Sequence, residues 1–118
     1  MFALNPSSNV PIYQQIVNQC RNLVAGGQLT PGDKLPAVRA IATELGVNPM
    51  TISKAYSLLD QIGIVKRQRG IGMVVSESGP MRARMGTTES KVLIAYAKKV
   101  GMTRTELVSQ IERLWEET

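Results

Sequence analysis

The feature that most constrains the fold is a short break between two helical patterns in the middle of the chain. Apolar residues recur at helical spacing from Val38 to Leu45, and Gly46 follows where a left-handed residue ends a helix. Asn48 then suits the N-cap of a second helix, and Pro49 suits its first position. Two helices joined by so short a turn cross steeply, and the second one projects. The sequence therefore predicts a helix-turn-helix whose second helix ends near Gln61.

The segments on either side complete a larger order of elements. A helix is expected over residues 11–25, ahead of the helix-turn-helix. After it, two β-branched runs at residues 64–67 and 73–76 flank a short glycine-containing connection, which is typical of a hairpin. Lys34-Leu35 is expected to form a very short strand. This order predicts a winged helix-turn-helix, a mainly α fold with a small β-hairpin wing.

Beyond the hairpin, Ser78-Gly79-Pro80 punctuates the chain and a polar link is expected to follow. Residues 88–100 show apolar positions at helical spacing, and the stretch Thr103 to Glu106 fits a capping box at the start of a last helix. We expect a winged helix-turn-helix domain over residues 1–78 and a short helical segment over residues 79–118.

The residue inventory limits the chemistry open to the chain. Its 118 residues include no histidine, which removes imidazole bases and histidine metal ligands. A single cysteine, Cys20, allows no intramolecular disulfide and no multi-cysteine zinc site, and its apolar spacing predicts a buried small hydrophobe. An enzyme would need a carboxylate cluster or an activated lysine, and Glu112, Glu116 and Glu117 are better interpreted as a solvated helix face. We expect no catalytic residue, no metal and no cofactor.

The positive charge of the chain is concentrated in one region. The net charge is +5, and the span from Lys34 to Arg84 holds eight basic and three acidic residues, which accounts for all of it. A local basic excess attracts polyanions, of which nucleic acid is the usual one in the cytoplasm. An idle solvated basic face is the competing interpretation, and charge alone does not decide between the two.

The chain carries no apparent membrane or export signal. No stretch approaches the roughly 20 continuous apolar residues that span a bilayer. Residues 1–10 lack the basic and apolar parts of a secretory signal. We therefore expect no membrane partner and residence in the cytoplasm.

The start of the projecting helix carries side chains suited to the major groove of DNA, which admits one helix. Polar side chains there can hydrogen-bond base edges or phosphates, Met50 can pack on a thymine methyl, and Lys54 can neutralise a phosphate. Asn48 and Thr51 are equally suited to helix capping, and hairpin cations can simply protect a strand edge. The convergence of a capped projecting helix, a basic hairpin and a local charge of +5 favours DNA.

Several spaced motifs resemble those of the GntR-type transcriptional regulators. They are residues 11–16 (PIYQQI), 29–36 (LTPGDKLP), 38–59 and the wing at 67–75. Residues 47–56 (VNPMTISKAY), with only about forty residues in the tail, look most like the YtrA subfamily. The resemblance implies a homodimeric bacterial repressor that binds a pseudo-palindromic operator in double-stranded DNA.

The resemblance also implies which positions contact DNA. They fall on Arg39, Asn48, Pro49, Met50, Thr51 and Ser53, and on Arg69 and Gly70 of the wing. Many family members carry Arg at the positions of Pro49 and Ser53, so Lys54 is expected to take over part of that role. Together with the basic residues of the region, the predicted DNA-binding set is Lys34, Arg39, Asn48, Pro49, Met50, Thr51, Ser53, Lys54, Lys66, Arg67, Arg69 and Gly70.

The C-terminal segment is too short for the effector-binding or aminotransferase-like domains of large GntR relatives. Two amphipathic helices without a third layer cannot bury both apolar faces, so we expect dimerisation. The candidate residues are Leu93, Tyr96, Val100, Leu107, Ile111, Leu114 and Trp115. The alternatives are helices that cap a monomer and, for the whole chain, a winged-helix protein-interaction module without specific DNA binding. A small-molecule effector is conceivable, but no polar cluster marks a site for one.

Overall fold

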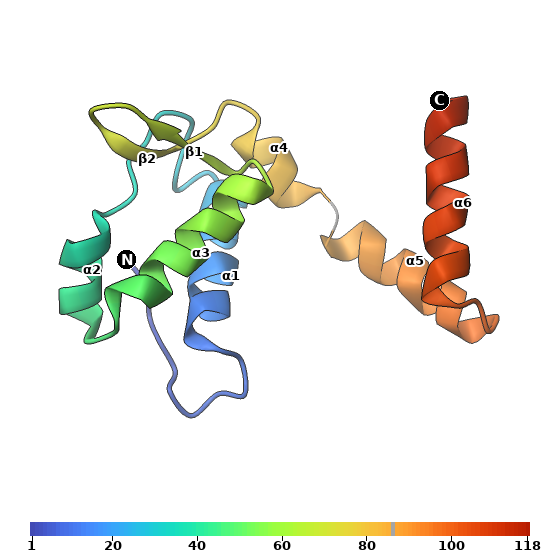
Figure 1. The fold of residues 1–118 in the computed structure, drawn as a ribbon, viewed down its shortest axis with the longest axis horizontal. Coiled ribbons are helices and arrows are strands. Elements are labelled where there is room, and N and C mark those ends of the chain that lie inside the picture. The colour runs from blue at the N-terminus through green and yellow to red at the C-terminus, as the bar shows by residue number, and fades with distance from the viewer. Residues whose placement is uncertain (86) are drawn as a thin grey trace. The chain divides into compact units, whose positions relative to one another are not determined.

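The computed structural model describes residues 1–85 and 87–118, without the side chain of Thr87, and divides the chain into two units. Met1–Arg84 forms the N-terminal unit, and Met85–Thr118 forms the tail. The N-terminal unit contains the helix-turn-helix and the hairpin, whereas the described part of the tail is built from helices alone (Figure 1).

The predicted helix-turn-helix is formed by α2 (Val38–Leu45) and α3 (Pro49–Gln61). Gly46 adopts the left-handed conformation with φ 69°, which glycine reaches without strain, so α2 ends there. The Asn48 side-chain oxygen accepts a hydrogen bond from the Met50 amide at 2.8 Å and caps α3. Both turn signals in the sequence are thus confirmed.

The first helix, α1 (Ile12–Ala25), packs against α3 and supplies a wall of the core. Pro11 is the N-cap of α1, so the helix begins one residue later than predicted. Cys20 is fully buried, as expected of a small hydrophobe, and burial raises the pKa of its thiol to about 11. The thiol therefore stays protonated at neutral pH and acts as a packing group.

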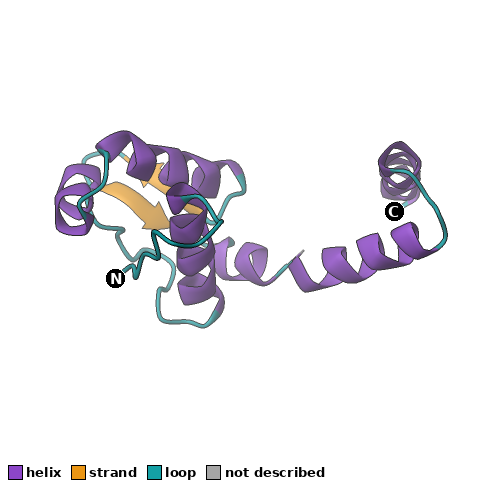
Figure 2. Ribbon diagram, turned by 90° about the horizontal axis from the view of Figure 1, so that it is seen from below, coloured by secondary structure: helices purple, strands orange, loops and turns teal. Residues whose placement is uncertain are grey.

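The wing is an antiparallel hairpin of β1 (Val65–Gln68) and β2 (Gly72–Val75), with Val65 opposite Val75. Lys34 bridges Val74 on the other edge of β2, and the Leu35 amide donates to the Met73 carbonyl at 2.8 Å. The very short strand expected at Lys34-Leu35 is therefore a single β-bridge. Figure 2 shows the strands beside the helices of the N-terminal unit.

One side chain holds the projecting helix against the segment before α2. The Tyr56 hydroxyl donates to the Pro36 carbonyl at 2.8 Å. Burial, and to a lesser extent the nearby Cys20, raises the pKa of Tyr56 above its ordinary value. The hydroxyl therefore remains a donor at any physiological pH. This hydrogen bond keeps the start of α2 in register with the middle of α3.

The segment after the hairpin corrects the sequence prediction of a polar link. Gly79–Arg84 form a helix, α4, which packs against α1 within the N-terminal unit. Glycine suits its first position because a Cβ at residue 79 would lie 2.6 Å from the Ile64 carbonyl oxygen, and Ala83 is buried. Ser-Gly-Pro is typical of a turn, but proline is also tolerated in the first turn of a helix. The unit therefore continues past Ser78 to Arg84.

The residues before α1, for which the sequence makes no structural prediction, pack onto that helix. Phe2 is buried in the core, and the Ala3 amide donates to the Gln19 side-chain oxygen at 2.9 Å. The Gln15 side chain is buried and exchanges hydrogen bonds with both the amide and the carbonyl of Asn5, at 2.8 and 2.9 Å. These contacts make the N-terminal segment part of the folded unit.

The tail consists of α5 (Thr87–Lys99) and α6 (Arg104–Glu117), close to the helices predicted from the sequence. The capping box is confirmed, because the Thr103 hydroxyl accepts from the Glu106 amide at 3.1 Å and the Glu106 carboxylate accepts from the Thr103 amide at 3.2 Å. No side chain of α6 is buried. Of the helices that the structure describes, none has the length and apolar character needed to cross a membrane.

Candidate nucleic-acid interface

The outer face of α3, defined here by Met50, Ser53, Lys54 and Ser57, is a continuous exposed stripe. Ser53 and Lys54 lie three and four residues after Met50, and Ser57 lies four and three residues after them, so all four lie on one side of the helix. The opposite side, which includes Ile52 and Leu59, is fully buried in the core. Met50 is 76% exposed, so its side chain is free to contact a partner. The stripe is thus available to a partner.

The other predicted residues at the start of α3 have different surroundings. Asn48 and Pro49 are exposed, and the Asn48 side-chain oxygen is occupied by the cap of the helix. Thr51 is half-buried and lies beside the outer face of α3, not on it. The structure therefore brings Met50 and Ser53 together as base-contact candidates and leaves Thr51 at the edge.

Lys54 contacts another helix instead of extending freely into solvent. Its ammonium nitrogen lies 3.9 Å from the centroid of the Tyr13 ring on α1. Tyr13 is half-buried and packs against the core. A cation over an aromatic face is attracted by the ring quadrupole, so the contact holds the lysine against the protein surface.

The wing presents cations on a short two-stranded hairpin. Lys66, Arg67, Arg69 and Gly70 are all exposed, whereas Val65 at the start of β1 is buried. Gly70 has φ 79°, which favours glycine at this point of the hairpin turn. The predicted wing residues therefore lie together on one hairpin, as the sequence indicates.

A cleft at the base of the wing joins two predicted residues that are distant in sequence. Lys34 and Arg67 both line this cavity of about 210 Å³, together with Gly72 and Tyr56. The exposed Arg39 lies on the first turn of the neighbouring α2, a helix whose N-cap residue makes no side-chain hydrogen bond. Free backbone N–H groups at a helix start and nearby cations suit an oxyanion such as a phosphate.

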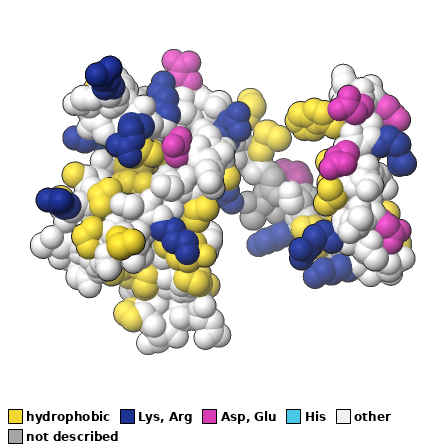
Figure 3. Space-filling view, in the orientation of Figure 1, with side chains coloured by type: hydrophobic (Ala, Val, Ile, Leu, Met, Phe, Trp, Pro, Cys, Tyr) yellow, Lys and Arg dark blue, Asp and Glu magenta, His cyan; other side chains and the backbone are white. Residues whose placement is uncertain are grey.

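The basic residues between Lys34 and Arg84 divide into two groups. Those of α2, α3, the wing and the loop before α2 are exposed, and none of their side chains is seen in a hydrogen bond to a backbone carbonyl of the described residues. Arg82 and Arg84 are engaged with the protein itself, since their guanidinium groups donate to the carbonyls of Ile62 at 3.4 Å and Ala25 at 3.2 Å. Figure 3 shows Lys and Arg side chains spread over the N-terminal unit, with few acidic ones between them.

Two residues of this surface are absent from the predicted set. Ser57 continues the outer face of α3 one turn beyond Ser53 and Lys54, and extending the spacing from Met50 would have found it. Tyr13 contacts Lys54 from α1, and no sequence pattern links two residues so far apart.

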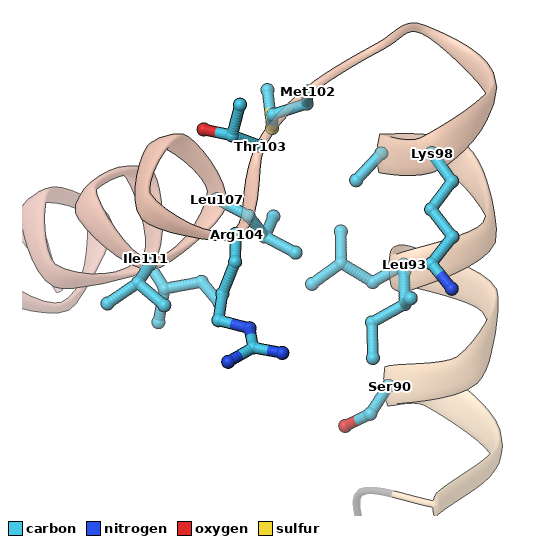
Figure 4. Close-up of a pocket in the computed structure, with 11 residues that line it drawn as sticks. Ser90, Leu93, Lys98, Met102, Thr103, Arg104, Leu107 and Ile111 are labelled. Carbon is cyan, nitrogen blue, oxygen red and sulfur yellow. The ribbon is translucent and has the colours of Figure 1, made fainter.

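In the tail, the predicted dimerisation residues line shallow hollows. A hollow of about 570 Å³ lies between α5 and α6, and its lining includes Leu93, Leu107 and Ile111 (Figure 4). Figure 4 also shows Arg104 extending from α6 toward α5. Leu114 and Trp115 border a second hollow. Val100 and Tyr96 are exposed. Within the tail, these side chains form an apolar surface that α5 and α6 leave at least partly exposed.

The structure also bears on metal chemistry. Among residues 1–85 and 87–118 there is no group of three or more Cys, Asp or Glu side chains placed to hold a metal ion.

Comparison with protein families finds a match to the model described as bacterial regulatory proteins, gntR family, over residues 12–75. The matched segment runs from the start of α1 to the end of β2. It therefore contains the helix-turn-helix, the wing and all of the predicted DNA-binding residues.

Known proteins resemble the chain over different lengths. The HTH-type transcriptional repressor YtrA of Bacillus subtilis is 46% identical over 78 residues, which cover 66% of this chain and 60% of that repressor. The chain thus matches less than two thirds of the length of this relative. A solved structure, YtrA from Sulfolobus acidocaldarius, a GntR-family transcription factor, is 37% identical, with a TM-score of 0.61 over 99% of this chain and 98% of that one.

A further solved structure is of interest because of what it contains. The crystal structure of AraR(DBD) in complex with operator ORE1 is 25% identical and has a TM-score of 0.54 over 64% of this chain and 93% of that one. The similarity thus covers about the extent of the N-terminal unit.

Proposed function

The chain belongs to the gntR family of bacterial regulatory proteins, and we propose that it is a repressor that binds a pseudo-palindromic operator in double-stranded DNA as a homodimer. The observation that carries the proposal is the capped α3 helix, whose exposed outer face lies in the same unit as the cationic wing. The similarity to AraR(DBD), a protein solved in complex with an operator, supports it. As a bacterial regulator that acts on DNA, the chain is proposed to reside in the cytoplasm.

In this proposal α3 enters the major groove with its outer face toward the bases. Met50 packs on a thymine methyl, and the Ser53 hydroxyl hydrogen-bonds a base edge or a phosphate. Asn48, Pro49 and Thr51 lie at the start of the helix, where they contact the backbone or the nearest base pair. The outer face of α3 thereby supplies sequence preference.

Cations around α3 supply affinity that does not depend on sequence. Lys34 and Arg67 share the cleft at the base of the wing, and Arg39 lies on the first turn of α2 beside it. Lys66, Arg69 and Gly70 extend the contact along the wing to the flanking backbone. Each phosphate that such a residue neutralises releases a counterion, so binding weakens steeply as salt is raised.

The tail is the proposed dimerisation element. Its large apolar side chains are exposed, and an apolar surface of this kind marks an interface with another protein. The charged residues of α5 are three lysines and one glutamate, Glu89, whereas those of α6 are four glutamates and two arginines. Pairing α5 of one copy with α6 of the other would therefore bring opposite charges together. In Figure 3 basic side chains gather at the end of α5, and acidic ones lie along α6.

Selection of bound fragments from genomic DNA tests the proposal. A two-fold dimer should enrich a symmetric motif whose half-sites lie about 34 Å apart, or a multiple of that distance. Enrichment of a single unrepeated half-site would contradict the dimer, and failure to bind duplex DNA at about 100 mM salt would contradict DNA binding.

A salt series then tests the assigned cations on the selected duplex. Arg67→Ala should lower the slope of log affinity against log salt by about one, because one phosphate contact is lost. Arg82→Ala, which removes a cation that donates to the Ser78 hydroxyl and the Ile62 carbonyl, is the matched control and should leave the slope unchanged. Equal loss in both variants would show that binding follows net charge and not the wing.

A further inference from the structure

The contact between Lys54 and Tyr13 joins the outer face of α3 to a helix that carries none of the predicted DNA-binding residues. The ammonium nitrogen lies 3.9 Å from the ring centroid. The ring belongs to the first turn of α1, is half-buried and packs against the core. It is therefore a fixed platform, whereas the lysine on its own is a long chain with many rotamers.

The geometry of a cation–π contact leaves the lysine available to an anion. The ring attracts the ammonium through its quadrupole and takes up none of its N–H groups in a conventional hydrogen bond. The N–H groups that point away from the ring can donate to phosphate oxygens. The contact thus fixes where the charge is located without consuming its hydrogen bonds.

The position of Lys54 gives this fixed charge a consequence for DNA binding. Lys54 follows Met50 by four residues, so the two side chains are neighbours on the outer face of α3. A phosphate held at Lys54 would set the depth and the register at which Met50 meets the base pairs. A lysine ordered before binding also loses less side-chain freedom when the complex forms.

We propose that Tyr13 is a positioning residue for DNA binding, which holds the Lys54 ammonium against α1 so that it binds one backbone phosphate in register with Met50. The inference rests on the proposed function. It adds a residue from outside the helix-turn-helix and the wing to the determinants of operator binding. It also gives Lys54 a defined role in place of a freely moving charge.

A double-mutant cycle between Tyr13 and Lys54 tests the proposal. The affinity of the full-length chain is measured by fluorescence anisotropy on the duplex obtained by selection, and on a scrambled duplex of equal length, over a range of salt. Tyr13→Leu should weaken binding about two- to fivefold when Lys54 is present, the effect expected for loss of an exposed cation–π contact. The same substitution should have no effect in the Lys54→Ala background.

The salt dependence separates positioning from charge. Lys54→Ala should lower the salt slope by about one, whereas Tyr13→Leu should keep the slope of the original protein, because the cation is still present. Tyr13→Phe keeps the ring and should restore the original affinity. Gln14→Leu changes the neighbouring residue of α1 and is the matched control. The NMR signals of the Lys54 side chain should show a ring-current shift in the free protein, absent in Tyr13→Leu.

Several results would overturn the inference. Equal weakening by Tyr13→Leu with and without Lys54 would mean that the ring acts through folding or touches DNA itself. Tighter binding by Tyr13→Leu would mean that the ring withholds the lysine from DNA. Loss of affinity in Tyr13→Phe would assign the effect to the hydroxyl. If the original protein bound neither duplex, the proposed function itself would fail. That outcome is distinct from the three results above, because each of them requires the original protein to bind DNA.

Discussion

The N-terminal unit and the tail use apolar residues in opposite ways. In the N-terminal unit, large side chains such as Ile16, Ile52 and Leu59 are fully buried, and the unit has a core of its own. Among the described side chains of the tail, Ala97 is the buried hydrophobic one, while Leu93, Tyr96 and others remain exposed. One unit is therefore folded around its own core, whereas the other leaves most of its large apolar side chains exposed.

Removal of the tail is the most drastic test of this difference. A chain that ends at Arg84 keeps α4 in place and should fold, because the core of the N-terminal unit is intact. It should sediment as a monomer and bind a symmetric operator about 10²- to 10⁴-fold more weakly, since the two half-sites no longer reinforce each other. Sedimentation velocity and fluorescence anisotropy measure the two effects. A truncated chain that remained a dimer would place the interface in the N-terminal unit.

The same substitution in each unit gives a matched comparison. Ile52 is fully buried, whereas Ile111 is 43% exposed. Ile52→Ala should lower the free energy of unfolding by about 2–5 kcal/mol, whatever the protein concentration. Ile111→Ala should instead weaken the dimer, so its effect on urea unfolding should depend on concentration. Concentration-independent loss in both variants would mean that the tail has a core that does not require a second copy.

The elements that sequence predicts well are those whose boundaries depend on local backbone chemistry. Gly46 ends α2 because it reaches a positive φ without strain, and Asn48 starts α3 because its side chain reaches the Met50 amide. The capping box at Thr103 and Glu106 is likewise complete within four residues. Such signals are contained in a few neighbouring residues, so no knowledge of the rest of the fold is needed.

The elements that cannot be predicted from the sequence depend on contacts between residues far apart in the chain. Glycine suits the start of α4 because the backbone of Ile64 lies close to residue 79, and the residues next to Gly79 in the sequence do not indicate this contact. Phe2 is buried by residues far along the chain. In the candidate site, the exposed residues of α3 follow from helical spacing, whereas the cleft shared by Lys34 and Arg67 depends on how the wing folds back onto the loop before α2.

Met50 and Trp115 sharpen the comparison, because both are apolar side chains left largely in solvent, at 76% and 79% exposure. Their expected partners differ. Met50→Ala should change preference at one base pair of the operator by about 1–3 kcal/mol and leave the dimer intact. Trp115→Ala should weaken the dimer and leave base preference as it was. Competition binding with single-base operator variants measures the first effect, and sedimentation measures the second; an exchange of the two results would contradict both assignments.

The smallest effect is expected at Arg84, the last residue of the N-terminal unit. The last turn of α1 contains no basic residue, and Arg84 Nε donates to the Ala25 carbonyl at 3.2 Å, which places a cation at the negative end of that helix. Arg84→Gln should therefore lower the free energy of unfolding by about 0.3–1 kcal/mol in urea titrations. The salt slope for DNA binding of Arg84→Gln should equal that of the original protein, because the Arg84 guanidinium is already engaged at the end of a helix. Arg67→Gln should instead lower the slope. If both variants lowered the slope by about one, Arg84 would count among the phosphate ligands, and the DNA-binding surface would reach the start of the tail.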